Sequence, residues 1–247
     1  MLNNETMGKL RSMRLTGIAD ALEEQEENSG YREMEFGDRL GLLVDREFGR
    51  RRRNRLQRLV NGANFANSSA CVEDIRYDDD RRLDRNLVLE LASCNYVRHA
   101  RNVVITGPTG AGKSYLTQAL GQSACRQLST VKYFQLPYML EEFQMAGHKG
   151  LETYNRLLKQ LVKVDLLILD DWLLFPVSEE DTRLLLSLID RRHNRKATIV
   201  ASQYDPAEWL DQIPIAVAAE AITDRIASQA YRIVIGGSKS MRAKTFD

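Results

Sequence analysis

The glycine-rich stretch GPTGAGKS, residues 107–114, constrains the fold of this chain more than any other feature. It matches the pattern G-x-x-x-x-G-K-[ST], and it stands between an apolar run at 102–106 and a segment with helical patterning at 112–128. In such a strand–loop–helix unit the backbone amides point inward at phosphate groups, close to the positive end of the helix. The motif therefore predicts a nucleotide-binding α/β domain and not an ordinary glycine turn.

Short apolar runs and helical stretches alternate along the chain after residue 101. Such alternation is typical of a parallel sheet whose strands are joined by crossover helices. The expected strands are residues 102–106, 131–134, 164–170, 197–202 and 232–235. The expected helices between them are residues 112–128, 138–146, 150–162, 179–194 and 216–229. We therefore expect a P-loop α/β domain with a five-stranded parallel sheet flanked by helices.

The residues of the glycine-rich loop suit the chemistry of phosphate binding. Its glycines let the backbone curl around the phosphates. Lys113 is expected to reach the outer phosphates, and Ser114 to supply a hydroxyl to Mg²⁺, a hard cation that prefers oxygen ligands. The predicted ATP-binding residues are Gly107, Pro108, Thr109, Gly110, Ala111, Gly112, Lys113, Ser114 and Tyr115. ATP and Mg²⁺ are thus the expected cofactors, with Lys113 also counted as catalytic.

Polar residues end two further strands. The run VDLLILDDW delivers Asp170 and Asp171 to the carboxyl edge of the sheet, where ligands of open α/β sheets bind. Asp170 is expected to reach Mg²⁺ through water, and Asp171 to orient or deprotonate the attacking water. The run ATIVASQ ends in Ser202 and Gln203, which we expect beside the two acids as candidate sensors of the γ-phosphate.

Charge is segregated at the N-terminal end, although the whole chain has a formal net charge of only +1. Residues 20–47 contain ten acids and three arginines, and the ten residues that follow Phe48, GRRRRNRLQR, contain six arginines and no acid. This arginine block consists of Arg50, Arg51, Arg52, Arg53, Arg55 and Arg58. By itself the block fits a solvated helix face as well as a nucleic-acid contact.

The periodic pattern divides the chain into domains. Apolar spacing predicts one amphipathic helix over residues 5–28 and a second over 36–60 that carries the arginine block. Turn-forming residues then replace the pattern at 61–69. We expect a small all-α N-terminal domain over residues 1–66, a linker and entry over 67–100, and an ATPase domain over 101–247.

Several protein classes are disfavoured. Cys71, Cys94 and Cys125 form no CxxC pair and the three histidines are scattered, so neither a disulfide framework nor a zinc site is expected. No run approaches the roughly 18 apolar residues of a membrane span, and the N-terminus lacks the pattern of a leader. A cytoplasmic protein, associated with the nucleoid when on DNA, is the expectation.

The motifs taken together resemble the AAA+ ATPases of the helicase-loader clade, and within it the IstB-like family of transposase-helper ATPases. The likeness covers nearly the whole chain. Its residues are LRSMRLTGIADALEE at 10–24, DRE at 45–47, the glycine loop, LLILDDW at 166–172, SQYDPAEW at 202–209, AITDRI at 221–226 and GGSKSMR at 236–242.

The resemblance implies roles for two more arginines. Arg225 matches the arginine finger that enters a neighbouring subunit's ATP site, and Arg242 matches a sensor near the phosphates. A finger supplied from another subunit requires an oligomer and is worth on the order of 10³ to 10⁵ in rate. The alternatives are a helix salt bridge of Arg225 with Asp224 or Glu220, and an exposed tail charge for Arg242. Since about a dozen residues follow the fifth strand, no separate C-terminal lid domain is expected.

The resemblance also implies a function. It indicates an ATPase that oligomerises on DNA and assists a partner transposase in insertion-sequence transposition, by selecting or remodelling target DNA. Hydrolysis is expected to be Mg²⁺-dependent, slow, and stimulated by DNA or by oligomerisation. The arginine block would bind the DNA backbone with little sequence specificity. The resemblance also implies a second DNA contact, because relatives place a DNA-contacting insertion in the helical stretch before the two acids. The cations of this stretch are Lys149, Arg156, Lys159 and Lys163, and an exposed, solvated helix would account for their pattern at least as well.

Other functions stay open at this point. A loader of a replicative helicase, similar to DnaC, would use the N-terminal helices to grip a protein. A nucleotide-dependent scaffold would bind ATP without turnover. A metabolic kinase would need an acceptor-binding element after the fifth strand, which the sequence does not show.

Overall fold

The computed structural model describes residues 4–237 of the chain. Contacts within the chain define two compact units, residues up to Arg58 and residues from Leu59 onward. The division falls inside the long helix α3 (Phe36–Ala63), whereas the turn-forming residues suggested a boundary at 66. Ala63 at the end of α3 is fully buried and belongs to the second unit. Each unit is described by itself below.

The first unit is a helical hairpin with a short helix before it. Its elements are α1 (Asn4–Ser12), α2 (Thr16–Glu27), the 3₁₀ helix η1 (Ser29–Glu33) and the part of α3 up to Arg58. The single helix expected over residues 5–28 is wrong, because the chain leaves helical geometry at Arg14, where φ is +60°. Gly17 follows this break and lies so close to α3 that a Cβ there would be 2.7 Å from Oε2 of Glu47. The expected single helix is therefore two helices, α1 and α2, and α2 packs closely against α3 at Gly17.

Polar side chains join α2 to α3 along the hairpin. The side-chain amide of Gln25 donates to the carbonyl oxygen of Arg39 at 3.0 Å, and Nε of Arg39 donates back to Oε1 of Gln25 at 3.1 Å. Arg46 pairs with Glu24 at 2.6 Å. Part of the acidic excess of α2 is therefore matched by arginines on the first half of α3.

The second unit contains the predicted sheet. Its strands are β1 (Val103–Thr106), β2 (Val131–Gln135), β3 (Leu166–Asp170), β4 (Ala197–Ser202) and β5 (Tyr231–Val234). All pairings are parallel, and the strand order is β2-β3-β4-β1-β5. The residues of β1, β3 and β4 are all buried, which agrees with their continuous apolar runs. The expected five-stranded parallel sheet is confirmed.

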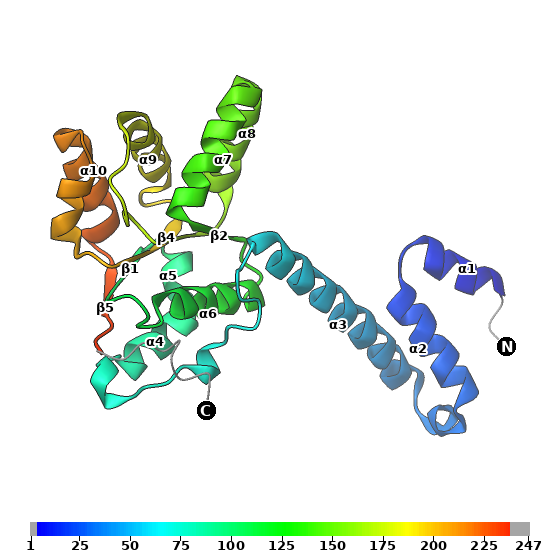
Figure 1. The fold of residues 1–247 in the computed structure, drawn as a ribbon. Coiled ribbons are helices and arrows are strands. Elements are labelled where there is room, and N and C mark those ends of the chain that lie inside the picture. The colour runs from blue at the N-terminus through cyan, green and yellow to red at the C-terminus, as the bar shows by residue number, and fades with distance from the viewer. Residues whose placement is uncertain (1–3, 238–247) are drawn as a thin grey trace. The chain divides into compact units, whose positions relative to one another are not determined.

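Helices cover both faces of this sheet (Figure 1). One face carries α4 (Arg85–Ala92), α5 (Asn95–Arg98) and α6 (Lys113–Arg126). The other face carries α7 (Leu136–Lys149), α8 (Leu151–Lys163), α9 (Glu179–Arg192) and α10 (Ala216–Ala227). The described part of this unit also contains three 3₁₀ helices: η2 (Val72–Asp74), η3 (Asp79–Arg81) and η4 (Pro206–Gln212). Residues 67–100, expected as a linker and entry to the ATPase domain, contain the helices α4 and α5, and Val88 and Leu91 of α4 are buried.

The core on the α7–α10 face includes two tryptophans and a buried cation. The rings of Trp172 and Trp209 meet edge to face at 5.7 Å and are fully buried. Arg192 is also buried, and its guanidinium donates to the carbonyl oxygens of Leu161 at 2.6 Å and Val164 at 3.0 Å. These bonds tie the end of α8 to α9. Among residues 4–237, no helix is both long enough and apolar enough to cross a membrane.

Candidate nucleotide site

The glycine-rich loop connects the end of β1 to the start of α6. Gly107, Gly110 and Gly112 have φ of +154°, +80° and +91°, values that other residues rarely adopt. A side chain at Gly107 would also place its Cβ 2.4 Å from the carbonyl oxygen of Ile235. The curled loop therefore needs glycine for its backbone and for its packing, and its shape is one that cradles phosphate.

Lys113 lies inside this loop. Its side chain is largely buried, and Nζ donates to the carbonyl oxygens of Gly107 at 2.7 Å and Pro108 at 3.0 Å. Burial lowers the pKa of Lys113, and the nearby carboxylates of Asp170 and Asp171 oppose that shift. The ammonium thus occupies the space between the loop and the two acids, where phosphate oxygens would meet it.

Asp170 is the last residue of β3, and its side chain is fully buried. Burial raises the pKa of Asp170, while hydrogen bonds from the hydroxyls of Ser114 and Tyr133 favour its charged form. The Tyr133 hydroxyl lies 2.8 Å from Oδ2. The structure therefore brings Ser114 and Asp170 together. A hydroxyl beside a carboxylate is an all-oxygen donor set, which fits Mg²⁺.

Asp171 is directed differently from its neighbour. Its φ is +50°, a left-handed conformation that turns the chain directly after the strand. Its backbone amide donates to Oδ1 of Asp170 at 3.1 Å, and the side-chain amide of Gln135 donates to its Oδ2 at 2.7 Å. Gln135 ends β2, and the sheet register pairs it with Asp170. Sequence patterns did not single out Tyr133 or Gln135, since both lie on a strand whose partner was unknown.

The sheet order places the end of β4 between the loop after β1 and the acids after β3. Ser202 is fully buried there, and its hydroxyl donates to the carbonyl oxygen of Trp172 at 2.9 Å and accepts from the amide of Tyr204 at 3.1 Å. Ser202 therefore supports the loop that follows the acids. Gln203 is exposed at the same strand end. Of the two predicted sensors, Gln203 is the one whose side chain is accessible.

A cavity of about 260 Å³ lies beside the glycine loop. Its lining residues are Asp74, Ile75, Arg76, Arg81, Gly112, Tyr115 and Leu116. Arg81 is buried and donates from Nη2 to the carbonyl oxygen of Ala111 at 2.9 Å, while its own carbonyl accepts from the amide of Gly236 at 2.7 Å. This arginine connects the loop to the residues after β5. Sequence reasoning missed it, because segment 71–82 lacks an apolar period.

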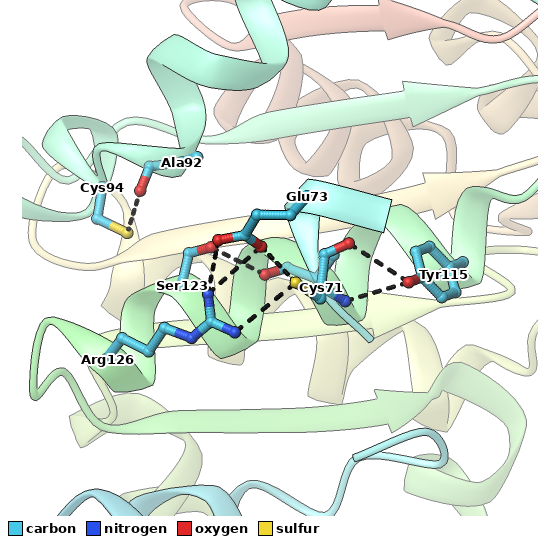
Figure 2. Close-up of polar contacts among 8 residues, drawn as sticks. Cys71, Glu73, Ala92, Cys94, Tyr115, Ser123 and Arg126 are labelled. Carbon is cyan, nitrogen blue, oxygen red and sulfur yellow. Dashed lines mark hydrogen bonds and ion pairs between the residues drawn. The ribbon is translucent and has the colours of Figure 1, made fainter. Parts of the chain in front are cut away.

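The same segment is tied to α6 (Figure 2). The Tyr115 hydroxyl donates to the carbonyl oxygen of Cys71 at 3.3 Å and accepts from its amide at 3.2 Å. Arg126, at the other end of α6, pairs with Glu73 at 3.1 Å, and Glu73 accepts a hydrogen bond from the thiol of Cys71. One wall of the cavity is thereby fixed to the helix that begins at Lys113.

Arg225 is distant from the glycine loop of its own chain. Its carbonyl oxygen accepts a hydrogen bond from Nδ2 of Asn102 at 3.0 Å, and Asn102 precedes β1, whereas the loop follows β1. Arg225 therefore lies at the amino edge of the sheet. Its guanidinium pairs with Asp190 of α9 at 3.0 Å and not with Asp224 or Glu220, the partners considered from the sequence.

The arginine block separates into two groups. Arg50 and Arg51 bind the buried carboxylate of Glu47 at 2.9 and 2.6 Å, and Arg50 also donates to the carbonyl oxygen of Arg14 at 2.9 Å. The amide of Gly17 donates to the same carboxylate at 2.8 Å. These bonds lower the pKa of Glu47 to about 2, and the bond from Arg50 contributes most to the shift. Arg50 and Arg51 thus hold the hairpin together.

The other arginines of the block are exposed. Within residues 4–237, Arg52, Arg53 and Arg55 make no hydrogen bond or ion pair, and Arg58 bonds only the carbonyl oxygen of Asn54 on its own helix, at 3.2 Å. These four side chains are free to meet an external anion.

The second cationic group lies on α7 and α8. Lys149 ends α7, and α8 carries Arg156, Lys159 and Lys163, all exposed. Lys149 and Arg156 line a groove of about 260 Å³ between the two helices. The described part of the chain offers no counter-ion to any of the four. Arg242, the predicted sensor, lies outside the described residues.

Comparison with known proteins agrees with this geometry. The family described as IstB-like ATP binding protein matches residues 8–246. A Pseudomonas fluorescens protein described as an ATP-binding protein of insertion sequence IS1162 is 42% identical over 82% of this chain and 87% of its own length. The y4pL protein of Sinorhizobium fredii, described as an insertion-sequence ATP-binding protein, is 36% identical over 98% of both chains.

Solved structures share the fold of a large part of this chain. The replication initiator DnaA bound to AMPPCP and single-stranded DNA has a TM-score of 0.58 at 22% identity, over 70% of this chain and 51% of that one. The DnaC helicase loader has a TM-score of 0.55 at 18% identity, over 67% of this chain and 96% of that one. At these identities the likeness concerns the fold.

Proposed function

This chain belongs to the IstB-like ATP-binding protein family, and we propose that it is a Mg²⁺-dependent ATPase that assembles on DNA and assists a transposase. The observation that carries the proposal is the meeting of Lys113, Ser114 and Asp170 at the carboxyl edge of the sheet. Lys113 and Ser114 lie at the start of α6, where they would meet the outer phosphates and a metal, and Asp170 at the end of β3 would supply a second oxygen ligand. The protein would act in the cytoplasm, at the nucleoid when on DNA.

ATP would bind along the glycine loop. Residues 107–115 hold the phosphates with backbone amides and Lys113, and the cavity beside Arg81 and Tyr115 has the place and size for the base. Ser114 and, through water, Asp170 would hold Mg²⁺, which would neutralise phosphate charge. Asp171, which accepts a hydrogen bond from Gln135, would position or deprotonate the attacking water, and the exposed Gln203 would contact the γ-phosphate.

A second copy of the chain would complete the site. Arg225 lies at the edge of the sheet away from its own loop, so this finger can serve only a neighbouring subunit's nucleotide. ATP would thereby favour assembly, and each subunit added would bring another set of free arginines to the DNA backbone. Arg52, Arg53, Arg55 and Arg58 are the contacts proposed on α3, with Lys149, Arg156, Lys159 and Lys163 on α7 and α8.

Filter binding of duplex DNA tests the ATP-dependent part of this proposal. We expect tight binding with ATP and weak binding with ADP or no nucleotide. Lys113→Ala is expected to weaken ATP binding roughly tenfold or more, because it removes a charged hydrogen-bond donor to phosphate. Equal DNA binding with and without ATP would contradict the proposal, and absence of turnover in the wild type would leave a nucleotide-dependent scaffold.

The partner is tested separately. The transposase is proposed because relatives of this chain are described as insertion-sequence proteins. In a pull-down with ATP, the full chain is expected to retain the transposase of its own insertion sequence and not the replicative helicase of its host. Retention of the helicase alone would instead support a loader function.

A further inference from the structure

We propose that Tyr133 is a positioning residue for the Asp170 carboxylate, held in place by the segment that directly follows α3. The inference rests on the proposed function, in which Asp170 faces Mg²⁺. Tyr133 lies on β2 opposite Ile168 of β3, and its hydroxyl donates to Oδ2 of Asp170 at 2.8 Å. Neither the nucleotide loop nor the family motifs include this tyrosine.

Both oxygens of Asp170 have a fixed donor. Oδ2 accepts from Tyr133, and Oδ1 accepts from the backbone amide of Asp171 at 3.1 Å. An ionised carboxylate only accepts hydrogen bonds, so the Tyr133 hydroxyl is the donor in this pair. A carboxylate held at both oxygens keeps one orientation, and donors of this kind tune the affinity of metal ligands.

The ring of Tyr133 has its own support. It is largely buried and contacts the ring of Phe65, with centroids 6.4 Å apart and planes tilted by 52°. Phe65 follows the last residue of α3, Ala63, by two positions. Gly121 of α6 makes room for it, since a Cβ there would lie 2.6 Å from the Phe65 ring and 2.8 Å from Cδ1 of Ile168.

The neighbours of Phe65 are fixed to the same helix. The amide of Asn67 donates to Oε1 of Gln118 at 2.6 Å, and Nε2 of Gln118 donates to the carbonyl oxygen of Ser114 at 3.0 Å. Nε2 of Gln122 donates to the carbonyl oxygen of Ser68 at 2.7 Å. Residues 65–68 therefore contact two side chains that bond the proposed metal ligands. Phe65 packs against Tyr133, which bonds Asp170, and Asn67 bonds Gln118, which bonds the carbonyl oxygen of Ser114.

This arrangement connects the nucleotide site to residues 65–68, which directly follow α3. α3 runs directly into the segment, and the segment contacts the residues that orient the metal ligands. A coupling of this kind is shown only by measured interaction energies, so the test is built as a double-mutant cycle.

The first variant is Tyr133→Phe in the full chain, which keeps the ring and removes the hydroxyl. Binding of a fluorescent ATP analogue is measured in EDTA and in rising Mg²⁺. We expect the half-saturating Mg²⁺ concentration to rise roughly tenfold, as for other residues that orient metal ligands, with binding in EDTA unchanged. Tyr154→Phe is the matched control, since Tyr154 also packs on a phenylalanine, Phe143, and its hydroxyl makes no hydrogen bond to the described residues.

The second variant is Phe65→Leu, which keeps the Tyr133 hydroxyl but removes the aromatic ring that packs against the Tyr133 ring. It is expected to raise the half-saturating Mg²⁺ concentration severalfold in the wild-type background and to add nothing in the Tyr133→Phe background. Thermal unfolding without nucleotide confirms that each variant is folded, and Mn²⁺ binding to the nucleotide complex, read by electron paramagnetic resonance, gives a second measure of metal affinity.

The outcomes separate this inference from the proposed function. Mg²⁺ curves for Tyr133→Phe within twofold of wild type, or full additivity of the two variants, would overturn the positioning role while the wild type still binds ATP with Mg²⁺. A wild-type protein whose ATP binding ignores Mg²⁺ would overturn the proposed function itself and this inference with it.

Discussion

The guanidinium of Arg225 is paired with Asp190 of its own chain, with Nε 3.0 Å from Oδ1. The two residues come from α10 and α9, and their side chains are 30% and 59% exposed. Ion pairs this open to solvent contribute little to stability, about 1 kcal/mol or less. Exchange of Asp190 for the phosphates of a neighbouring subunit would therefore cost the proposed finger little free energy.

Arg225→Ala is expected to lower ATP turnover on the order of 10³-fold while leaving binding of an ATP analogue intact, because the proposed finger would act on the site of a neighbouring subunit. Mixing Arg225→Ala with Lys113→Ala is expected to restore part of the turnover, since one chain retains a working site and the other a working finger. Phosphate release from the separate and mixed proteins measures both effects. Arg195→Ala, an exposed arginine nearby, is the control. Mixed chains as inactive as each alone would contradict a finger acting between subunits.

The arginine block is expected to divide by function. Replacing Arg52, Arg53 and Arg55 with Gln should weaken DNA binding and reduce the slope of log affinity against log salt by roughly one for each phosphate that is no longer bound. Unchanged salt dependence in a titration from low to high salt would show that these arginines do not touch phosphate. Arg50→Gln should instead destabilise the α2–α3 hairpin, because Arg50 binds Glu47 and the carbonyl oxygen of Arg14.

Glu47 gives the hairpin a pH dependence. Its pKa in the folded protein is about 2, below the ordinary value of 4.5. Its stabilisation is therefore fully present above pH 4.5 and is lost as the pH falls toward 2. Glu47→Gln is expected to destabilise the hairpin by about 1 to 3 kcal/mol at neutral pH, and the difference from wild type should shrink through that window.

Hydrogen exchange of α2 and α3, compared between the two proteins at each pH, measures this difference. Glu24→Gln is the matched control, because the pair of Glu24 with Arg46 is about half exposed and should matter little. A difference between Glu47→Gln and wild type that stays constant from neutral pH down to about pH 2 would show that the charge of Glu47 contributes nothing.

Arg192 is expected to stabilise the second unit from inside. Burial lowers the pKa of Arg192 to about 9, so the side chain stays charged at neutral pH, and its charge is met by backbone carbonyls and the Thr198 hydroxyl. Arg192→Met leaves those carbonyls without donors and should cost about 3 kcal/mol or more, lowering the thermal midpoint by roughly 10 °C. Arg191→Met, at the exposed neighbouring position, should leave the midpoint unchanged. Similar midpoints for the two variants in calorimetry would contradict this role.

Local sequence patterns were sufficient to predict the five strands of the sheet and the glycine-rich loop. Each strand is a short apolar run, and the glycine-rich loop carries its own geometric requirement, so both follow from neighbouring residues alone. The break at Arg14 was not predictable in this way. Residues 5–28 have helical spacing throughout, yet the helix is interrupted at Arg14, and Gly17 after the break packs against Glu47, thirty positions later in the chain.

The sequence by itself thus determined the fold class, the loop that would hold phosphates, and the acids at the end of β3. Only the tertiary structure decided which side chains surround them. Tyr133 and Gln135 reach Asp170 and Asp171 because β2 pairs with β3, and Arg81 reaches the loop through a segment with no periodic pattern. The tertiary structure also separated Arg50 and Arg51, bound to Glu47, from the free arginines beside them. Backbone preferences and apolar periodicity act between near neighbours, whereas these interactions join residues far apart in sequence.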